Sequence, residues 1–194
     1  MKTRILRILT ATLVVGILLL PLFTSAAEQV EKNDLQPKIT VRVDGLTCPF
    51  CAYGLEKRIK KLSAVQKWHI DIKKGTMELF PKVGQYIDLD EVKQAVKNAG
   101  FTPKGFRVAL TGKLIEWEGK PAFLIVSTSE NKQKIKIKYL LKENELLGEL
   151  KASIESLDEQ VFIAGEAVKK KSDKQKARPY TIIAEKFHIL SGER

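Results

Sequence analysis

Sulfur and imidazole are scarce in this chain of 194 residues, which contains two cysteines and two histidines. Two cysteines cannot hold a chain of this length together, so we expect cores built from hydrophobic side chains. A closed zinc site takes four protein ligands, which these residues do not offer at a suitable spacing. The sequence also has no nucleophile–base arrangement, no glycine loop for phosphate and no internal repeat. These absences predict a protein that is not an enzyme.

Aromatic residues are also few, at 7%, whereas basic residues are abundant and give a formal net charge of +11. Proteins that bind single-stranded nucleic acid combine basic grooves with aromatic stacking platforms. The lysines of this chain instead alternate with acidic and apolar residues. We therefore predict no nucleic-acid partner. The basic side chains are interpreted as a solvated surface that could face anionic lipid or an acidic protein.

The chain has one long hydrophobic run, residues 8–23, which follows three basic residues and precedes the small residues 24–27. This order is typical of a secretory signal peptide, here residues 1–27. The run is short for a membrane span of about 20 residues. An uncleaved membrane anchor is the alternative, and only in that case do we expect contact with a membrane. We predict an exported protein, located in a bacterial periplasm or secreted.

The remaining sequence divides into a linker and two parts with different hydrophobic patterns. Residues 28–37 are polar and end in a proline, as expected of a linker. Residues 38–106 predict the order strand, helix, strand, strand, helix, strand, which is that of a ferredoxin-like βαββαβ sandwich with both helices on one side of an antiparallel sheet. Residues 107–194 predict four or five strands with one helix, 146–157, before the last pair, which favours a small OB-like barrel. The fold class is therefore α+β.

Local signals mark the turns and helix ends of the first part. Strand alternation in residues 65–72 is broken once, near Gln66, and Gly75 can adopt the positive φ of a hairpin turn. Asp88 is a good N-cap for the second helix, and Gly100 suits its end. The predicted elements are a strand at 39–43, a helix around 55–62, strands at 65–72 and 77–80, a helix at 89–99 and a strand from Phe106.

Both cysteines lie in the stretch GLTCPFCAYGLEKRI, residues 45–59, just ahead of the first helix. Pro49 directly follows Cys48, and proline is favoured at the first position of a helix. The thiols of Cys48 and Cys51 should therefore lie at the first turn, where unpaired N–H groups favour the thiolate form.

Three interpretations of this pair remain open. A structural disulfide would close a very short loop and stabilise the fold little. A thiol–disulfide oxidoreductase also carries C-x-x-C between a strand and a helix, but neither Pro81 nor Pro103 is placed like the cis-proline of thioredoxin-like enzymes. A pair of thiolates suits soft ions that accept two ligands, Cu(I) or Hg(II). Zn(II) is less suited because His69 and His188 lie far from the cysteines in sequence.

Residues 38–104 resemble the heavy-metal-associated domain family, which includes copper chaperones, modules of metal-pumping ATPases and the periplasmic mercury-binding protein. The family signature G-M-T-C-x-x-C reads here from Gly45 to Cys51, and the family's G-[YF] after the second helix corresponds to Gly100-Phe101. The resemblance implies that Cys48 and Cys51 bind the metal and pass it by ligand exchange to or from a partner protein. It also implies that Leu46 packs beneath the loop in place of the usual methionine, and that Phe101 lies near the loop and shields it.

Other residues of interest have more ordinary explanations. Tyr53 and Trp68 could line the site, but aromatic residues in such a domain are more often in the core. We expect His69 at the surface or packed, and a structural role for His188 within an apolar strand. The first helix has a basic face, expected to be solvated or to guide docking onto an acidic partner. Its residues are Lys57, Arg58, Lys60 and Lys61.

Overall fold

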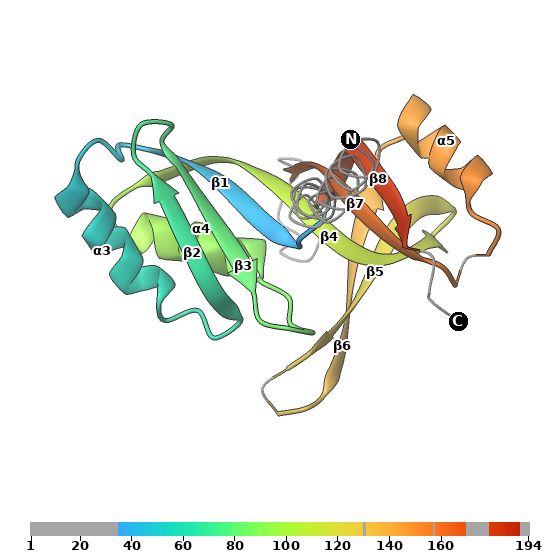
Figure 1. The fold of residues 1–194 in the computed structure, drawn as a ribbon, viewed down its shortest axis with the longest axis horizontal. Coiled ribbons are helices and arrows are strands. Elements are labelled where there is room, and N and C mark those ends of the chain that lie inside the picture. The colour runs from blue at the N-terminus through green and yellow to red at the C-terminus, as the bar shows by residue number, and fades with distance from the viewer. Residues whose placement is uncertain (1–34, 130, 157, 170–178, 191–194) are drawn as a thin grey trace, which may run out of the picture. The chain divides into compact units, whose positions relative to one another are not determined.

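The computed structural model describes residues 35–129, 131–156, 158–169 and 179–190. The predicted signal peptide and most of the predicted linker lie outside the described residues. The elements are β1 (Lys38–Asp44), α3 (Pro49–Ile59), β2 (Val65–Asp71), β3 (Thr76–Pro81), α4 (Leu89–Asn98), β4 (Thr102–Trp117), β5 (Lys120–Thr128), β6 (Lys134–Leu141), α5 (Glu145–Ser153), β7 (Gln160–Val168) and β8 (Thr181–Leu190) (Figure 1). Within these ranges, no helix is both long and apolar enough to cross a membrane.

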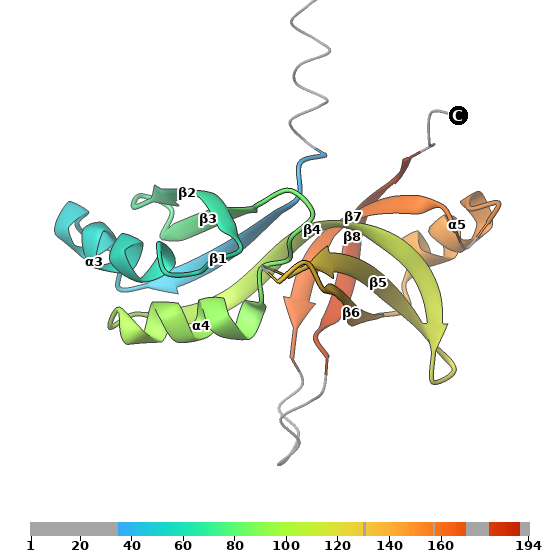
Figure 2. The ribbon, with the colours of Figure 1, turned by 90° about the horizontal axis from the view of Figure 1, so that it is seen from below.

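The first part of the chain forms a sheet with the strand order β2-β3-β1-β4, in which every neighbouring pair is antiparallel. Figure 2 shows α3 and α4 together on one side of these strands. The predicted ferredoxin-like βαββαβ arrangement is therefore confirmed.

The local signals in this part have the predicted consequences. The register of β2 against β3 shifts between Val65 and Lys67, at the break near Gln66, and Gly75 has φ 61°. The side chain of Asp88 caps α4 by accepting hydrogen bonds from the backbone N–H groups of Asp90 and Glu91.

Apolar side chains between the sheet and its two helices form the core of this part. Residues Val41, Leu55, Leu79 and Val92 are 0% exposed, and they come from β1, α3, β3 and α4 respectively. Burying one such side chain stabilises the fold by about 1.5–3 kcal/mol. The core therefore fixes both helices against the sheet.

Strand β4 continues without a break from this sheet into the second part of the chain. Its residues 102–109 pair with β1, residues 106–112 pair with β7, and residues 113–117 pair with β5. The strand expected from Phe106 thus starts earlier, at Thr102, and continues to Trp117. The domain boundary between residues 106 and 107 stays a prediction, and it falls inside this strand.

The strands of the second part pair in a ring. β4 pairs with β5, β5 with β6, β6 with β8, β8 with β7, and β7 again with β4. All pairs are antiparallel except β6 with β8.

Helix α5 ends at Ser153, so the predicted helix 146–157 was too long. Ile154 has extended backbone there and packs against the hydrophobic core.

Polar side chains make a second connection between the two parts. The hydroxyl groups of Tyr86 and Tyr139 are 2.5 Å apart. The Asp90 carboxylate accepts hydrogen bonds from the Tyr180 hydroxyl at 2.8 Å and from the Lys169 ammonium at 2.6 Å. Burial alone would raise the pKa of Asp90, but these two hydrogen bonds, together with the positive charges of Lys169 and Lys93, lower that pKa overall. The carboxylate is therefore held in its charged form between the two parts.

A close backbone contact between β7 and β8 provides a test of the ring. A Cβ atom on Gly165 would lie 2.1 Å from the backbone oxygen of Ile183, so the strands would have to move apart. We expect Gly165→Ala to lower the free energy of unfolding by about 1–3 kcal/mol. In the control Gly148→Ala, the new Cβ meets nothing within 4 Å in helix α5, and a gain of about 0.5–1 kcal/mol is expected. Urea unfolding of both variants measures the difference, and equal stabilities would contradict the packing.

The tyrosine pair predicts a loss of stability at alkaline pH. Burial raises the pKa of Tyr86 to about 12, whereas an unfolded tyrosine ionises near about 10. The stabilisation is fully present below pH about 10 and is lost as the pH rises towards about 12. Tyr86→Phe should make the slope of unfolding free energy against pH shallower by up to about 1.4 kcal/mol per pH unit in this window. Denaturant unfolding between these pH values measures the slope. An unchanged slope would contradict the assignment.

Candidate metal site

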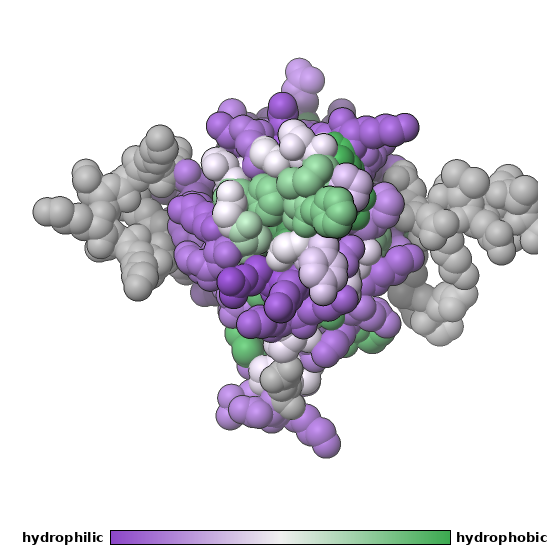
Figure 3. Space-filling view, turned by 90° about the vertical axis from the view of Figure 1, so that its left-hand side faces the viewer, coloured by the Kyte–Doolittle hydropathy of each residue, from purple (hydrophilic) through white to green (hydrophobic). Residues whose placement is uncertain are grey.

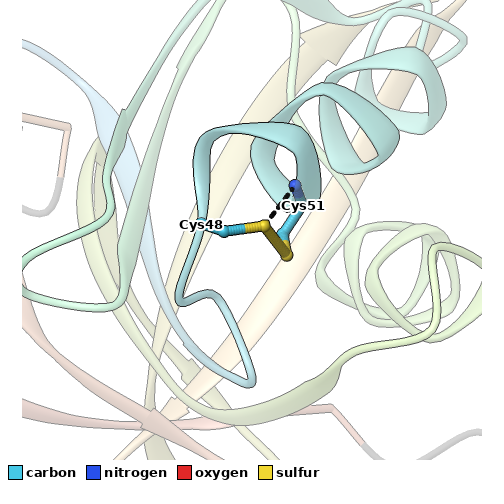
Figure 4. Close-up of a disulfide and its surroundings, with 2 residues drawn as sticks. All are labelled: Cys48 and Cys51. Atoms are coloured by element: carbon cyan, nitrogen blue, oxygen red, sulfur yellow. Dashed lines mark hydrogen bonds between the residues drawn. A yellow bond between two sulfur atoms is a disulfide. The ribbon is translucent and has the colours of Figure 1, made fainter.

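The two cysteines lie at the start of helix α3, as the sequence predicts. Cys48 is the N-cap residue, with extended backbone at φ −143° and ψ 155°, and Pro49 is the first helical residue. The Sγ atom of Cys48 accepts a hydrogen bond from the backbone N–H of Cys51 at 3.1 Å (Figure 4). A sulfur atom thus takes the place that a serine or aspartate oxygen usually has at a helix N-terminus.

The structure joins Cys48 and Cys51 in a disulfide, with their Cα atoms 5.2 Å apart. Both residues are half-buried, so the sulfur pair lies at the protein surface rather than in the core. Reduction of this bond would leave two thiols side by side, and the N–H of Cys51 would point at one of them. Such a pair is well suited to a soft cation.

The floor of the loop is apolar. Leu46 is 3% exposed and belongs to the hydrophobic core, which agrees with its expected position beneath the loop. Gly45 has φ +91°, and the Phe101 ring lies 3.5 Å from the position that a Cβ atom would occupy there. Phe101 therefore lies next to the loop, as the resemblance implied.

The outer surface of the site is apolar as well. Phe50, between the cysteines, is 90% exposed, and Tyr53 is 69% exposed. The expectation of a core position for Tyr53 was wrong, because the buried face of α3 is made by Leu55 and Ile59. Trp68 is half-buried against the core, with the Lys60 ammonium 5.5 Å from its ring centroid. Figure 3 views the end of the molecule that carries α3 and shows an apolar area surrounded by hydrophilic side chains.

The two histidines lie on strands and do not join the cysteine pair, as their distance from the cysteines in the sequence predicts. His69 is exposed on β2, and His188 is half-buried on β8 opposite Phe162. In the described ranges, no three residues of the types His, Cys, Asp and Glu gather at a point where they could hold a metal ion. The described part of the chain therefore offers a soft metal two sulfur ligands.

The basic residues of α3 and its end, Lys57, Arg58, Lys60 and Lys61, are all exposed.

Fold and site together define a small α+β module with a surface thiol pair at a helix N-terminus. Residues 40–102 match the family of the heavy-metal-associated domain. This part of the chain is a heavy-metal-associated domain, and Cys48 and Cys51 form its C-x-x-C pair. No curated protein matches the chain.

Several solved structures are similar to this part of the chain. A copper-binding domain from HMA7, a P-type ATPase, is 22% identical, with 36% of this chain and 92% of that chain covered and a TM-score of 0.32. The CopZ metallochaperone is 15% identical, with coverage of 34% and 98% and a TM-score of 0.32. The yeast copper transporter domain Ccc2a is 19% identical, with coverage of 35% and 92% and a TM-score of 0.32.

The sulfur cap predicts a difference between two substitutions that both remove the thiol. The side chain in Cys48→Ser can still accept the hydrogen bond from the Cys51 N–H, whereas the side chain in Cys48→Ala cannot. Loss of an N-cap costs about 1 kcal/mol. Under reducing conditions we therefore expect Cys48→Ser to be more stable than Cys48→Ala by about 1 kcal/mol in urea unfolding. Equal stabilities would show that the capping contact contributes nothing.

Proposed function

We propose that this protein is exported and carries one soft metal ion, Cu(I) or Hg(II), on Cys48 and Cys51, and that it passes the ion on by ligand exchange. The observation that supports this best is the position of the pair, adjacent and half-exposed at the N-terminus of α3 in a heavy-metal-associated domain. Zn(II) is less suited, because it prefers four protein ligands and the described residues bring two together. Export rests on the signal-like pattern of residues 1–27.

Loading of the ion requires the reduced pair. The disulfide accepts two electrons from a dithiol, which becomes a disulfide in turn, and Cys48 and Cys51 become thiols. The N–H of Cys51 and the positive end of helix α3 then favour loss of the thiol protons. The two thiolates bind the cation, and the protons are released to water.

Transfer of the ion depends on the exposure of the loop. A thiolate of the partner can approach the half-buried sulfur pair and become a third ligand of the ion. One cysteine of this chain then leaves, a second partner thiolate replaces the other, and the ion keeps its oxidation state throughout. No covalent bond of a substrate is broken, so the protein acts as a carrier rather than an enzyme.

The second part of the chain is assigned as a docking module of the OB-barrel type. Its pairing order β4-β5-β6-β8-β7, which returns to β4, and its single parallel pair between β6 and β8 support this assignment. The helix α5 between β6 and β7 fits the same type.

Metal stoichiometry tests the proposal. Reduced wild-type protein, Cys48→Ser and Thr47→Ser are each mixed with Cu(I) or Hg(II) in the presence of a competing thiol and examined by native mass spectrometry. One ion per chain is expected for wild type and for Thr47→Ser, which changes an exposed neighbour in the same loop. Cys48→Ser should bind none, because one thiolate alone does not compete with the added thiol.

Two results would overturn this assignment. Retention of the ion by Cys48→Ser would place the metal elsewhere. Failure of wild type to bind either ion, together with catalytic reduction or reshuffling of protein disulfides, would instead favour the other interpretation of the pair, a periplasmic thiol–disulfide oxidoreductase.

A further inference from the structure

Strand β6 has one edge that is largely unpaired in the described part of the chain. It pairs with β5 from Lys134 to Leu140, which is all but its last residue. On the other edge it pairs with β8 only at Leu140 and Leu141. There the N–H of Leu140 donates to the backbone oxygen of Tyr180 at 3.0 Å. Because successive N–H groups of a strand point to opposite edges, those of Lys134, Lys136 and Lys138 face the same edge as that of Leu140. Among the described residues, a row of backbone donors and acceptors there is therefore left without a neighbouring strand.

A groove made of two adjoining cavities lies beside β6, partly at this edge and partly over the face that β6 shares with β5. A cavity of about 460 Å³ lies on one stretch and is lined by Lys136, Lys138 and Tyr139 of β6 and by Tyr86, Asp90 and Tyr180. A second cavity of about 410 Å³ is lined by Ile135 and Ile137 of β6 and by Tyr86, Asp88 and Glu91. The two cavities share Tyr86, Asp88 and Ile137. The first cavity is also lined by Trp117, Lys169 and Pro179 of the second part, and the second cavity by Ser127, Thr128 and Ser129 at the end of β5. The groove therefore lies between residues of the heavy-metal-associated domain and the second part, with β6 along its length.

The two faces of β6 differ in chemistry. Lys134, Lys136 and Lys138 project from one face and are exposed, whereas Ile135 and Ile137 project from the other. Ile135 is 48% exposed, which is unusual for an isoleucine beside a packed core. The acidic residues Asp88 and Glu91 line the second cavity together with these isoleucines. A strand added here would therefore meet the positive charge of the lysines on one face. On the other face it would meet the apolar isoleucines, with the two carboxylates close by.

We propose that this edge of β6, which is unpaired among the described residues, binds an extended segment of a partner protein that joins the sheet as an additional strand. The two faces determine the sequence of this segment. Its alternate side chains are acidic, opposite the three lysines, and the side chains between them are apolar, opposite Ile135 and Ile137. Asp88 and Glu91 repel acidic side chains from the apolar face and so fix the register. Binding of this segment requires neither the metal nor the thiol pair.

The test uses the full chain labelled with ¹⁵N and a capped heptapeptide in which glutamate alternates with valine. We expect the peptide to shift the backbone amide signals of Lys134, Lys136 and Lys138 and to slow their hydrogen exchange. The same peptide with its edge-facing amides N-methylated keeps its charge but cannot pair, and it should not bind. A peptide with lysine in place of glutamate should not bind either.

Two variants locate the site. Lys136→Glu should weaken binding of the glutamate–valine peptide about fivefold to tenfold, because one favourable charge pair becomes a repulsion. Lys73→Glu makes the same change of charge at an exposed residue in the turn between β2 and β3, and should leave the affinity unchanged.

Three results would overturn the proposal. Equal binding of the N-methylated peptide would show simple charge attraction without strand pairing. Slow exchange of the Lys136 and Lys138 amides in the free monomer would show that the chain itself covers the edge. Slow exchange that depends on protein concentration would show that a second copy does.

Discussion

The strand β4 is the constraint on which both parts of this protein depend. Between Phe106 and Ala109 each residue pairs with β1 on one side and with β7 on the other. The alternation of buried and exposed side chains is lost at this point, where Val108, Ala109 and Leu110 are all buried in succession. Three buried neighbours on one strand mean that both of its faces are covered there. The metal-binding domain and the ring of strands are therefore two regions of one continuous sheet, and their registers are set together.

The thiol pair depends on a second, local constraint, the N-terminus of α3. Leu55 and Ile59 are both 0% exposed, so these side chains fix the helix against the core, while its first residues lie at the surface. Cys48 is the last residue before the helix, and its sulfur takes over the capping role. The backbone N–H of Cys51, which finds its hydrogen-bond acceptor in this sulfur, also favours the thiolate form of Cys48 once the disulfide is reduced. One contact thus serves both the fold and the chemistry of the site.

Sequence reasoning succeeded where the signal is carried by neighbouring residues. Pro49, Gly75 and Asp88 act within one turn of the chain, and each has the structural role that its chemistry predicts. It failed where the outcome depends on distant partners. The contact between Asp90 and Tyr180 joins residues 90 positions apart, and no spacing pattern in the sequence predicts it. The exposure of Tyr53 could not be inferred either, because the face of α3 that is buried is decided by the sheet beneath it. The ligand roles of Cys48 and Cys51 remain predictions, although their positions at the helix start agree with them.

The continuous sheet bears on the proposed transfer of a metal ion to a partner. The polar contacts of Asp90 with Lys169 and Tyr180 reinforce the connection that β4 makes, so the groove along β6 and the start of α3 belong to one connected framework. Under the proposed function, a partner held at β6 would stay attached to the molecule that carries Cys48 and Cys51, so its thiols would meet the pair at a raised effective concentration. Ligand exchange between loosely associated proteins is slowed by the need to meet in one orientation. An additional strand in the groove would supply that orientation through backbone pairing, without burying the exposed sulfur pair that the exchange requires.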